Sequence, residues 1–325
     1  MIARLLKILL ALQLLAVAGL WYAARTRWHI ESPALALALA VGSLVLFRLL
    51  ISGHNFWQSW RYRSATPDQY QLRLLDRCHL FLGEFRASML TSSWDMVRPG
   101  PGLHIAPGSA PGITPDAPGL ALPLLLLHGY ACNGGYWSPL SRRLRQSHIS
   151  YFAPDMQPAA DAGIDDYVPL VQRAVKQLCE RSGSARVIIV AHSMGGLVAR
   201  AYLREHGSAR IARVITLGAP HHGTALASFG FGLNAQQMQR SSGGASAWLT
   251  VLAAAESESQ RALFTSIFSH HDNIIAPQTS SYLPGAKNIE FGAIGHVALG
   301  SNEAVMQCVL DEVALAASAA SQACN

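Results

Sequence analysis

The apolar residues of the first 60 positions form two long runs. Residues 8–24 contain no charged side chain over 17 positions, and residues 32–47 contain none over 16. A helix that spans a bilayer needs about 20 mainly apolar residues, with about 17 at the lower limit. The pattern therefore predicts two transmembrane helices, over residues 8–24 and 33–51, which the short polar segment 25–31 joins into a helical hairpin.

Two other interpretations of this region are open. Arg4 and Lys7, followed by an apolar run and small residues near position 18, also resemble a signal peptide. Residues 34–51 could instead form the buried core helix of a globular domain, which has a similar length and composition. The second apolar run follows the first at once, and this favours the hairpin over a cleaved leader.

The basic residues around the two runs set the expected orientation. Cytoplasmic flanks of membrane helices carry an excess of Lys and Arg. We therefore expect both chain ends, and the bulk of the chain, on the cytoplasmic side; a single span would place the bulk on the other side. Four basic residues flank the outer ends of the hairpin and two lie in its loop: Arg4, Lys7, Arg61 and Arg63 outside, Arg25 and Arg27 in the loop.

Residues 66–120 combine an amphipathic segment with a linker. Over residues 66–98, leucine and phenylalanine alternate with charged residues at helical spacing, which predicts an amphipathic helix. This helix either lies on the membrane surface or packs on the domain that follows, and we favour packing. Half of residues 99–120 are proline or glycine, so we expect a linker without regular structure.

Beyond residue 120 the apolar runs become short and alternate with helical patterns. Strands alternating with helices predict an α/β domain over residues 121–325, with a doubly wound, mostly parallel sheet that helices cover on both faces. In such sheets, reactive groups gather at the carboxyl ends of the strands. The predicted strands are residues 122–128, 151–153, 187–190, 214–217, 264–268 and 289–294, and the clearest helices are 167–179 and 197–205.

Composition and charge narrow the classes of function. Half of the residues are apolar and 14% are charged, which excludes an intrinsically disordered chain. The net charge of +6 lies in residues 1–98, which hold 11 basic and 5 acidic side chains, whereas the rest of the chain holds 14 of each. A nucleic-acid-binding protein carries its basic patch on the folded domain. The excess beside the apolar runs therefore indicates a membrane partner and no nucleic acid.

Residues 187–196 predict a strand, a sharp turn and a helix around a serine. Their sequence is V-I-I-V-A-H-S-M-G-G, with Ser193 at the turn. In a nucleophile elbow the serine lies in a strained turn above the sheet, and the residues two positions before and after it must be small, because strand and helix nearly touch there. Ala191, where glycine is usual, and Gly195 meet this requirement. We predict Ser193 as a nucleophile, with His192 and Gly195 supporting the turn.

A serine nucleophile needs a base, and the base needs an acid that orients it. In the chain order serine, acid, histidine, Asp272 directly follows the predicted strand 264–268 and His296 follows the strand 289–294. Both residues are thus expected on loops at strand ends. We predict Asp272 as the acid and His296 as the base. Glu290 lies inside a strand and is the poorer acid.

A serine that attacks a carbonyl also needs two backbone N–H groups to bind the oxyanion. One comes from the residue after the nucleophile, Met194. The other comes from the loop after an early strand, where the sequence L-H-G-Y places Tyr130. We expect His128 and Gly129 to shape this loop. The nearby Cys132 has no histidine that any pattern pairs with it, so it is not favoured as a nucleophile.

Several stretches of the chain occur together in one known group of proteins. They are His128-Gly129, A-H-S-M-G-G at 191–196, L-G-A-P-H-H-G-T at 217–224, His271-Asp272 and Gly295-His296. In combination they resemble bacterial lipases and esterases of the α/β-hydrolase superfamily, over roughly residues 121–315. The resemblance implies an α/β-hydrolase fold, with Ser193, Asp272 and His296 as catalytic triad and with Tyr130 and Met194 as oxyanion donors. The N-terminal hairpin departs from secreted lipases.

The sequence thus predicts a membrane-anchored serine hydrolase that cleaves carboxylic esters through an acyl-enzyme. Expected partners are an ester or lipid substrate and the membrane lipids around the hairpin, at the inner membrane of a bacterium with the catalytic domain facing the cytoplasm. An acyltransferase, a thioesterase or an amidase could use the same residues, and a membrane scaffold that binds without catalysing is a further alternative. The sequence predicts no oligomeric state.

No cofactor and no metal ion are expected. The histidine pairs at 221–222 and 270–271 lack the spacings of metal sites, and adjacent side chains rarely share one face of an element. Residues 225–263, which hold several large apolar side chains, are either a lid or acyl-binding wall or an ordinary helix on the sheet.

Overall fold

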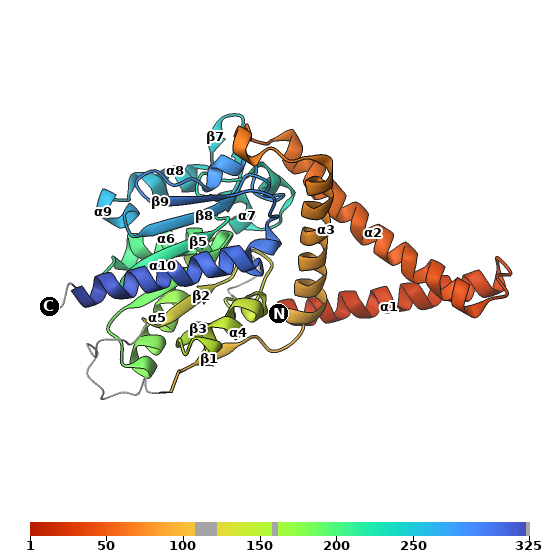
Figure 1. The fold of residues 1–325 in the computed structure, drawn as a ribbon, viewed down its shortest axis with the longest axis horizontal. Coiled ribbons are helices and arrows are strands. Elements are labelled where there is room, and N and C mark those ends of the chain that lie inside the picture. Colours follow the sequence, from red (N-terminus) through yellow and green to blue (C-terminus); the bar gives the residue numbers. More distant parts are fainter. Residues whose placement is uncertain (108–121, 158–161, 323–325) are drawn as a thin grey trace.

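A computed structural model of the chain describes residues 1–107, 122–157 and 162–322 (Figure 1). Its centre is a seven-stranded sheet in the order β1-β3-β2-β4-β5-β8-β9. All pairs are parallel except β1 with β3, at one edge of the sheet. The strands are β1 (Gly102–His104), β2 (Leu124–Leu127), β3 (Tyr151–Ala153), β4 (Val187–His192), β5 (Ile211–Leu217), β8 (Phe264–Ser269) and β9 (Lys287–Phe291).

Helices cover both faces of the sheet. Successive residues of a strand point to opposite faces, and accordingly Leu125 and Leu127 belong to one apolar core while Leu124 and Leu126 belong to the other. The first core contains α5 (Val168–Ser182), α6 (Met194–His206) and α8 (Ala247–Ala254), and the second contains α4 (Ser138–Gln146) and α10 (Glu303–Gln322). The predicted doubly wound, mostly parallel α/β domain is therefore confirmed.

The prediction failed at one edge of the sheet and omitted two helices. The composition of residues 99–120 predicted no regular structure, but β1 lies inside this stretch and pairs with β3. Backbone hydrogen bonds to an open strand edge do not depend on the side chains, so composition gave no sign of them. The remainder of the predicted linker, residues 108–120, lies outside the described residues. Helices α4 and α10 were not predicted.

Residues 225–263 form several short elements rather than one. The helix α8 buries Leu249 and Leu252 and packs on α6, which lies directly on the sheet. The other elements lie between β5 and β8 along the chain: η5 (Ala225–Phe229), α7 (Leu233–Gln237), the hairpin β6 (Arg240–Ser241) and β7 (Gly244–Ala245), and α9 (Glu258–Arg261).

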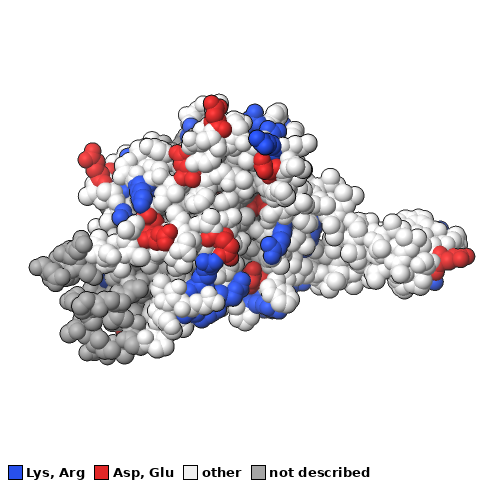
Figure 2. Space-filling model, in the orientation of Figure 1, with Lys and Arg blue, Asp and Glu red and all other residues white. Residues whose placement is uncertain are grey.

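The N-terminal region forms the helical hairpin α1 (Ile2–Thr26) and α2 (Pro33–Arg61). Ser32 caps α2 by accepting the N–H of Leu35, and proline occupies the first turn, where its missing N–H costs nothing. The hairpin projects far from the sheet (Figure 1) and, on the face in Figure 2, carries almost no charge except near its tip. Both helices are long and apolar enough to cross a membrane, a test that a signal sequence also passes.

The second helix does more than extend the hairpin. It runs on to Arg61 instead of ending at residue 51, and its last turns contact the α/β domain. The helix α3 (Leu74–Leu90), which a π-helical turn (Thr91–Asp95) extends, then runs alongside that domain (Figure 1). Its buried residues Leu80, Glu84 and Ala87 share one face at helical spacing. This helix therefore packs on the domain.

Candidate active site

Ser193 lies in a strained turn between β4 and α6. Its φ of 55° and ψ of −127° fall in a region that residues other than glycine rarely adopt. The helix α6 begins at the next residue, Met194. A Cβ atom on Gly195 would lie 2.6 Å from the carbonyl oxygen of Leu127, so this position has room only for glycine. The turn therefore has the geometry of a nucleophile elbow.

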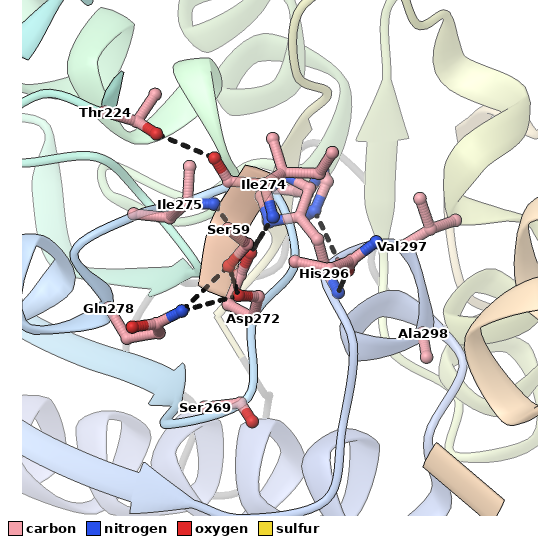
Figure 3. A network of polar contacts seen from close by, with 12 residues as sticks. Ser59, Thr224, Ser269, Asp272, Ile274, Ile275, Gln278, His296, Val297 and Ala298 are labelled. Carbon is pink, nitrogen blue, oxygen red and sulfur yellow. Dashed lines mark hydrogen bonds and ion pairs between the residues drawn. The ribbon is translucent and has the colours of Figure 1, made fainter. Parts of the chain in front are cut away.

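Asp272 and His296 form a buried pair (Figure 3). Asp272 follows β8 and His296 follows β9, and the Nδ1 atom of His296 lies 2.7 Å from Oδ2 of Asp272. The other carboxylate oxygen, Oδ1, accepts the N–H groups of Ile274 and Ile275, both at 2.8 Å. These two backbone bonds fix the carboxylate in one orientation, which leaves Oδ2 for the histidine.

Electrostatics favour the protonated form of His296. Burial by itself lowers the pKa of this histidine, but the negative charge of Asp272, its hydrogen bond and the negative charge of Glu84 together raise the pKa above its ordinary value of 6.5. Gly218, with a φ of 54°, lies against this pair. A Cβ on Gly218 would be 3.0 Å from Asp272 Oδ2 and 3.2 Å from His296 Nδ1, which explains the glycine in the L-G-A-P stretch.

The loop after β2 lies against the elbow. A Cβ on Gly129 would be 2.9 Å from the Cβ of Ser193. Among the described residues, neither the Tyr130 N–H nor the Met194 N–H donates a hydrogen bond, so both donors are available beside the serine. The phenol of Tyr130 is fixed by Phe231, since it donates to the carbonyl at 2.9 Å and accepts the N–H at 3.0 Å.

His128 and His192 are buried neutral histidines with defined tautomers. The Nε2 atom of His128 accepts the N–H of Met156, so its Nδ1–H donates to the carbonyl of Gly129 at 3.0 Å. His192 donates its Nε2–H to the carbonyl of His296 at 3.2 Å. Burial lowers the pKa of both rings. The two residues thus shape the loops beside Ser193 and carry no charge at neutral pH.

A cavity of about 290 Å³ opens at Ser193. Within the described part of the chain, the hydroxyl of Ser193 has no hydrogen-bond partner; serine–histidine bonds of this kind often tighten only when substrate binds. Three residues of α2 also line the cavity, and none of them was predicted as a site residue: His54, Asn55 and Gln58. The apolar wall comes from η5, its neighbours and the loop after β8, and includes Leu226, Phe229, Met238, Ile274 and Ile275.

Sequence reasoning also missed three polar residues around the acid–base pair. Ser59 on α2 donates to the carbonyl of Asp272 at 2.8 Å, and Gln278 donates to the same carbonyl at 2.9 Å (Figure 3). Glu84 on α3 accepts backbone N–H groups just after His296. Ser59 and Gln278 left no signal in the sequence. For Glu84 a signal existed, namely a carboxylate on the apolar stripe of an amphipathic helix.

Cys132 and the two adjacent histidine pairs are the other reactive side chains that the sequence analysis considered. Partial burial raises the pKa of Cys132 to about 12, which leaves a protonated thiol that is a poor nucleophile. Within residues 1–107, 122–157 and 162–322, no group of three His, Cys, Asp or Glu side chains is placed to hold a metal ion. The four histidines of the two adjacent pairs hydrogen-bond inside the domain: His221 with Thr216, His222 with Tyr282, His270 with Glu290, and His271 with Ala293.

Part of this chain is similar in sequence to known proteins. It is 27% identical over 114 residues to a triacylglycerol lipase of Pseudarthrobacter phenanthrenivorans, a match that covers 33% of this chain and 35% of the relative. A triacylglycerol lipase of Burkholderia plantarii is 27% identical over 114 residues, covering 33% of this chain and 32% of the relative. The chain thus spans about a third of the length of these curated relatives.

Solved structures and family profiles extend the comparison. The mature form of the Bacillus licheniformis lipase BlEst2 matches with a TM-score of 0.53 at 16% identity, covering 60% of this chain and 93% of that chain. At this identity the likeness shows the fold alone. The family profile described as the alpha/beta hydrolase fold matches residues 123–286, which is half of the chain. This protein therefore belongs to the α/β-hydrolase fold family.

Proposed function

We propose that the protein is a membrane-anchored serine hydrolase that cleaves carboxylic esters. One observation carries the proposal: a strained Ser193 faces an apolar cavity, while an Asp272–His296 pair with a 2.7 Å hydrogen bond lies in the loops after β8 and β9. Serine, acid and base occur in the chain order of the family. The lipase relatives and the α/β-hydrolase fold support ester cleavage as the activity.

The chemistry follows from the residues in place. Nε2 of His296 accepts the proton of Ser193 Oγ as that oxygen attacks the ester carbonyl carbon. The carbonyl π bond becomes an oxyanion, to which the Tyr130 and Met194 N–H groups donate. The intermediate collapses, the alkoxide leaves with the proton from His296, and the acyl group stays on Ser193. Water, deprotonated by the same histidine, then attacks the acyl-enzyme and releases the acid. Asp272 keeps the proton of the ring on Nδ1 throughout.

The cavity favours an acyl chain as the group bound next to Ser193. Most residues of its wall are apolar, among them side chains from η5 and the loop after β8, and no Lys or Arg of the described residues lines it. Burial of apolar surface contributes about 0.8 kcal/mol per CH₂ group, so a longer acyl chain gains affinity until the cavity is filled. We infer a lipid-like ester as the substrate class.

The membrane arrangement is part of the same proposal. We assign residues 1–65 to the anchor, 66–120 to a connecting segment and 121–325 to the catalytic domain, which faces the cytoplasm at the inner membrane of a bacterium. The exposed apolar surface of α1 and α2 supports this assignment. We expect the chain to stay in the membrane fraction after alkaline carbonate washing. A carboxyl-terminal tag should resist protease in intact spheroplasts, and digestion of the tag there would reverse the orientation.

The function is tested with p-nitrophenyl esters from acetyl to palmitoyl, hydrolysed by the detergent-purified chain and by Ser193→Ala side by side. Serine-dependent hydrolysis is the expected result. A rate maximum at long chains would indicate a lipase, and a maximum at short chains an esterase. Absence of serine-dependent hydrolysis on every ester would contradict the proposal and would favour an acyltransferase, a thioesterase, an amidase or a non-catalytic role.

The pH dependence provides a second test. His296 must be neutral to accept the serine proton, and its raised pKa keeps the inactive protonated form present to higher pH. We therefore expect kcat/KM to fall as the pH is lowered through a pKa above 6.5. Burial lowers the pKa values of His128 and His192 below 6.5, so neither ring accounts for a limb above 6.5. A kcat/KM profile between about pH 5 and pH 9 measures the acid limb, and a limb well below 6.5 would contradict His296 as the base.

A further inference from the structure

Two helices outside the hydrolase family match reach the acid–base pair. The match begins at residue 123, yet Ser59 on α2 hydrogen-bonds the backbone of Asp272, and Glu84 on α3 hydrogen-bonds the backbone that follows His296. Of the two, Glu84 makes more hydrogen bonds to the loops of the pair, because both of its carboxylate oxygens accept a backbone N–H group.

Both oxygens of Glu84 are used at one turn. Oε1 accepts the N–H of Val297 at 3.0 Å and Oε2 accepts the N–H of Ala298 at 2.9 Å. These residues begin η7 (Val297–Gly300), directly after His296. The Glu84 side chain is buried, with 2% exposure. A Cβ on Gly295 would lie 2.5 Å from Oε2 of Glu84, so the glycine before His296 leaves the space that this carboxylate occupies.

Hydrogen bonds fix both the N–H and the carbonyl of His296, as well as the turn that follows. Its N–H donates to Oδ1 of Asn273 at 2.9 Å, and its carbonyl accepts Nε2–H of His192 at 3.2 Å. Glu84 fixes the next two peptide groups. A displacement of about 1 Å in a catalytic group can lower the rate about 100-fold. Restraints on this turn are therefore restraints on where Nε2 of His296 points.

The charge of Glu84 also acts on the ring. The titratable groups that face His296 are Asp272 from the loop after β8, Glu84 from α3 and the neutral His192 from the elbow. Tyr136 from η3 (Gly134–Trp137) is near Glu84 and Asp272, and its phenol stays protonated. Burial and the negative charge of Asp272 raise the pKa of Glu84, whereas its hydrogen bonds to Val297 and Ala298 and the charge of His296 oppose this rise.

Burying a carboxylate costs free energy that an apolar residue at the same helical position would not. The N–H groups of a turn at the protein surface can also donate to water, so such a turn does not need a buried carboxylate as its acceptor. The position of this carboxylate, two peptide groups from the base and on the same loop, points to a role in the reaction rather than in packing alone.

We propose that Glu84 is a positioning residue for the base: it holds the turn after His296 so that Nε2 faces Ser193, and its negative charge stabilises the imidazolium that forms when the serine proton is transferred. This inference rests on the proposed function. It makes α3, which lies outside the family match, a part of the catalytic centre.

The test uses the full-length detergent-purified chain with Glu84→Gln, Glu84→Asp and a matched control. Glutamine keeps the size of the side chain, but its NH₂ group cannot accept the second N–H, and the charge is lost. For Glu84→Gln we expect kcat to fall about 10- to 100-fold and the acid limb of kcat/KM to move to lower pH. Glu84→Asp keeps the charge, so the acid limb should stay in place while kcat falls less. The control, Glu312→Gln, changes a buried carboxylate that bonds Thr265 and Lys287 away from the site and should alter neither quantity.

A second readout separates this inference from the function on which it rests. With ¹³C-histidine labelling, NMR titration gives the pKa of His296 whether or not any ester is hydrolysed, and a His296→Gln spectrum assigns the signal. Glu84→Gln should lower this pKa. Wild-type kcat with an unmoved pKa in Glu84→Gln would overturn the proposal, as would a fall in kcat that only tracks a fall in Tm. If Glu84→Gln does not fold, Glu84→Asp provides the test. This variant keeps the charge, so a shift of its acid limb away from the wild-type position would overturn the proposal. Absence of Ser193-dependent hydrolysis in the wild type would reject the proposed function, whereas the NMR titration would still test the effect of Glu84 on His296.

Discussion

Replacing Ser193 with alanine is expected to lower kcat for ester hydrolysis by about 10⁴- to 10⁶-fold, as loss of a triad serine does elsewhere. The hydroxyl is the only group removed, and no described residue hydrogen-bonds to it, so no buried partner is left unpaired. Alanine tolerates the φ of 55° about as well as serine does. The elbow should therefore keep its shape, with Tm unchanged while turnover is lost.

The measurement is kcat on the best p-nitrophenyl ester, with Tm recorded for each protein. Ser147→Ala is the matched control, because Ser147 is exposed at the end of α4 and lies outside the site. A fluorophosphonate probe should label the wild type and Ser147→Ala, and should leave Ser193→Ala unlabelled. Ser193→Ala protein that keeps a tenth or more of wild-type kcat would show that another group attacks the ester.

The sheet and the elbow were predictable because their signals are local. A short apolar run before a turn, as in residues 187–192, places a buried strand without reference to any other part of the chain. The same holds for Gly195, because the carbonyl of Leu127 on the neighbouring strand leaves no room there for a side chain. Asp272 and His296 could be placed at strand ends by their position after two apolar runs, and the structure brings them within 2.7 Å.

The contributions of α2 and α3 could not be predicted in the same way. Ser59 lies more than 200 positions before its partner Asp272. The predicted membrane anchor already accounts for the apolar pattern of α2, so this pattern indicates no further contact. A single serine in such a helix carries no information about what it contacts. Glu84 differs, because a carboxylate on the apolar stripe of α3 costs free energy unless donors satisfy it. That mismatch between pattern and residue indicates a partner, although the sequence cannot say that the partner is the turn after His296.

The second helix of the hairpin also connects the proposed membrane anchor with the active-site cavity. His54, Asn55 and Gln58 line the cavity at Ser193, and they follow directly on the apolar run of α2. In the proposed arrangement, α2 leaves the membrane and ends at the active site, which places the cavity near the bilayer surface. The proposed lipid substrate would then be supplied where the cavity opens.

Asp272→Asn is expected to lower kcat by about 10⁴-fold, through the tautomer of His296 rather than through a change of shape. The N–H groups of Ile274 and Ile275 both require an acceptor at the position of Oδ1, so the asparagine carbonyl should occupy it. The asparagine NH₂ group then faces Nδ1 of His296 in place of Oδ2. A donor there forces Nδ1 to accept, which moves the ring proton to Nε2, the atom that must take the proton of Ser193. The base is thereby blocked, although the residue is nearly isosteric.

Glu290→Gln provides the matched control, because Glu290 bonds Nε2 of His270 at 2.8 Å and forms a second histidine–carboxylate pair outside the site. Removing its charge should leave kcat within a few-fold of the wild type. ¹⁵N spectra of labelled histidine should show His296 protonated on Nδ1 in the wild type and on Nε2 in Asp272→Asn. If Asp272→Asn kept kcat within tenfold, or if Glu290→Gln abolished it, the acid would have to be reassigned. A tautomer change without a loss of turnover would separate the orienting role of Asp272 from catalysis.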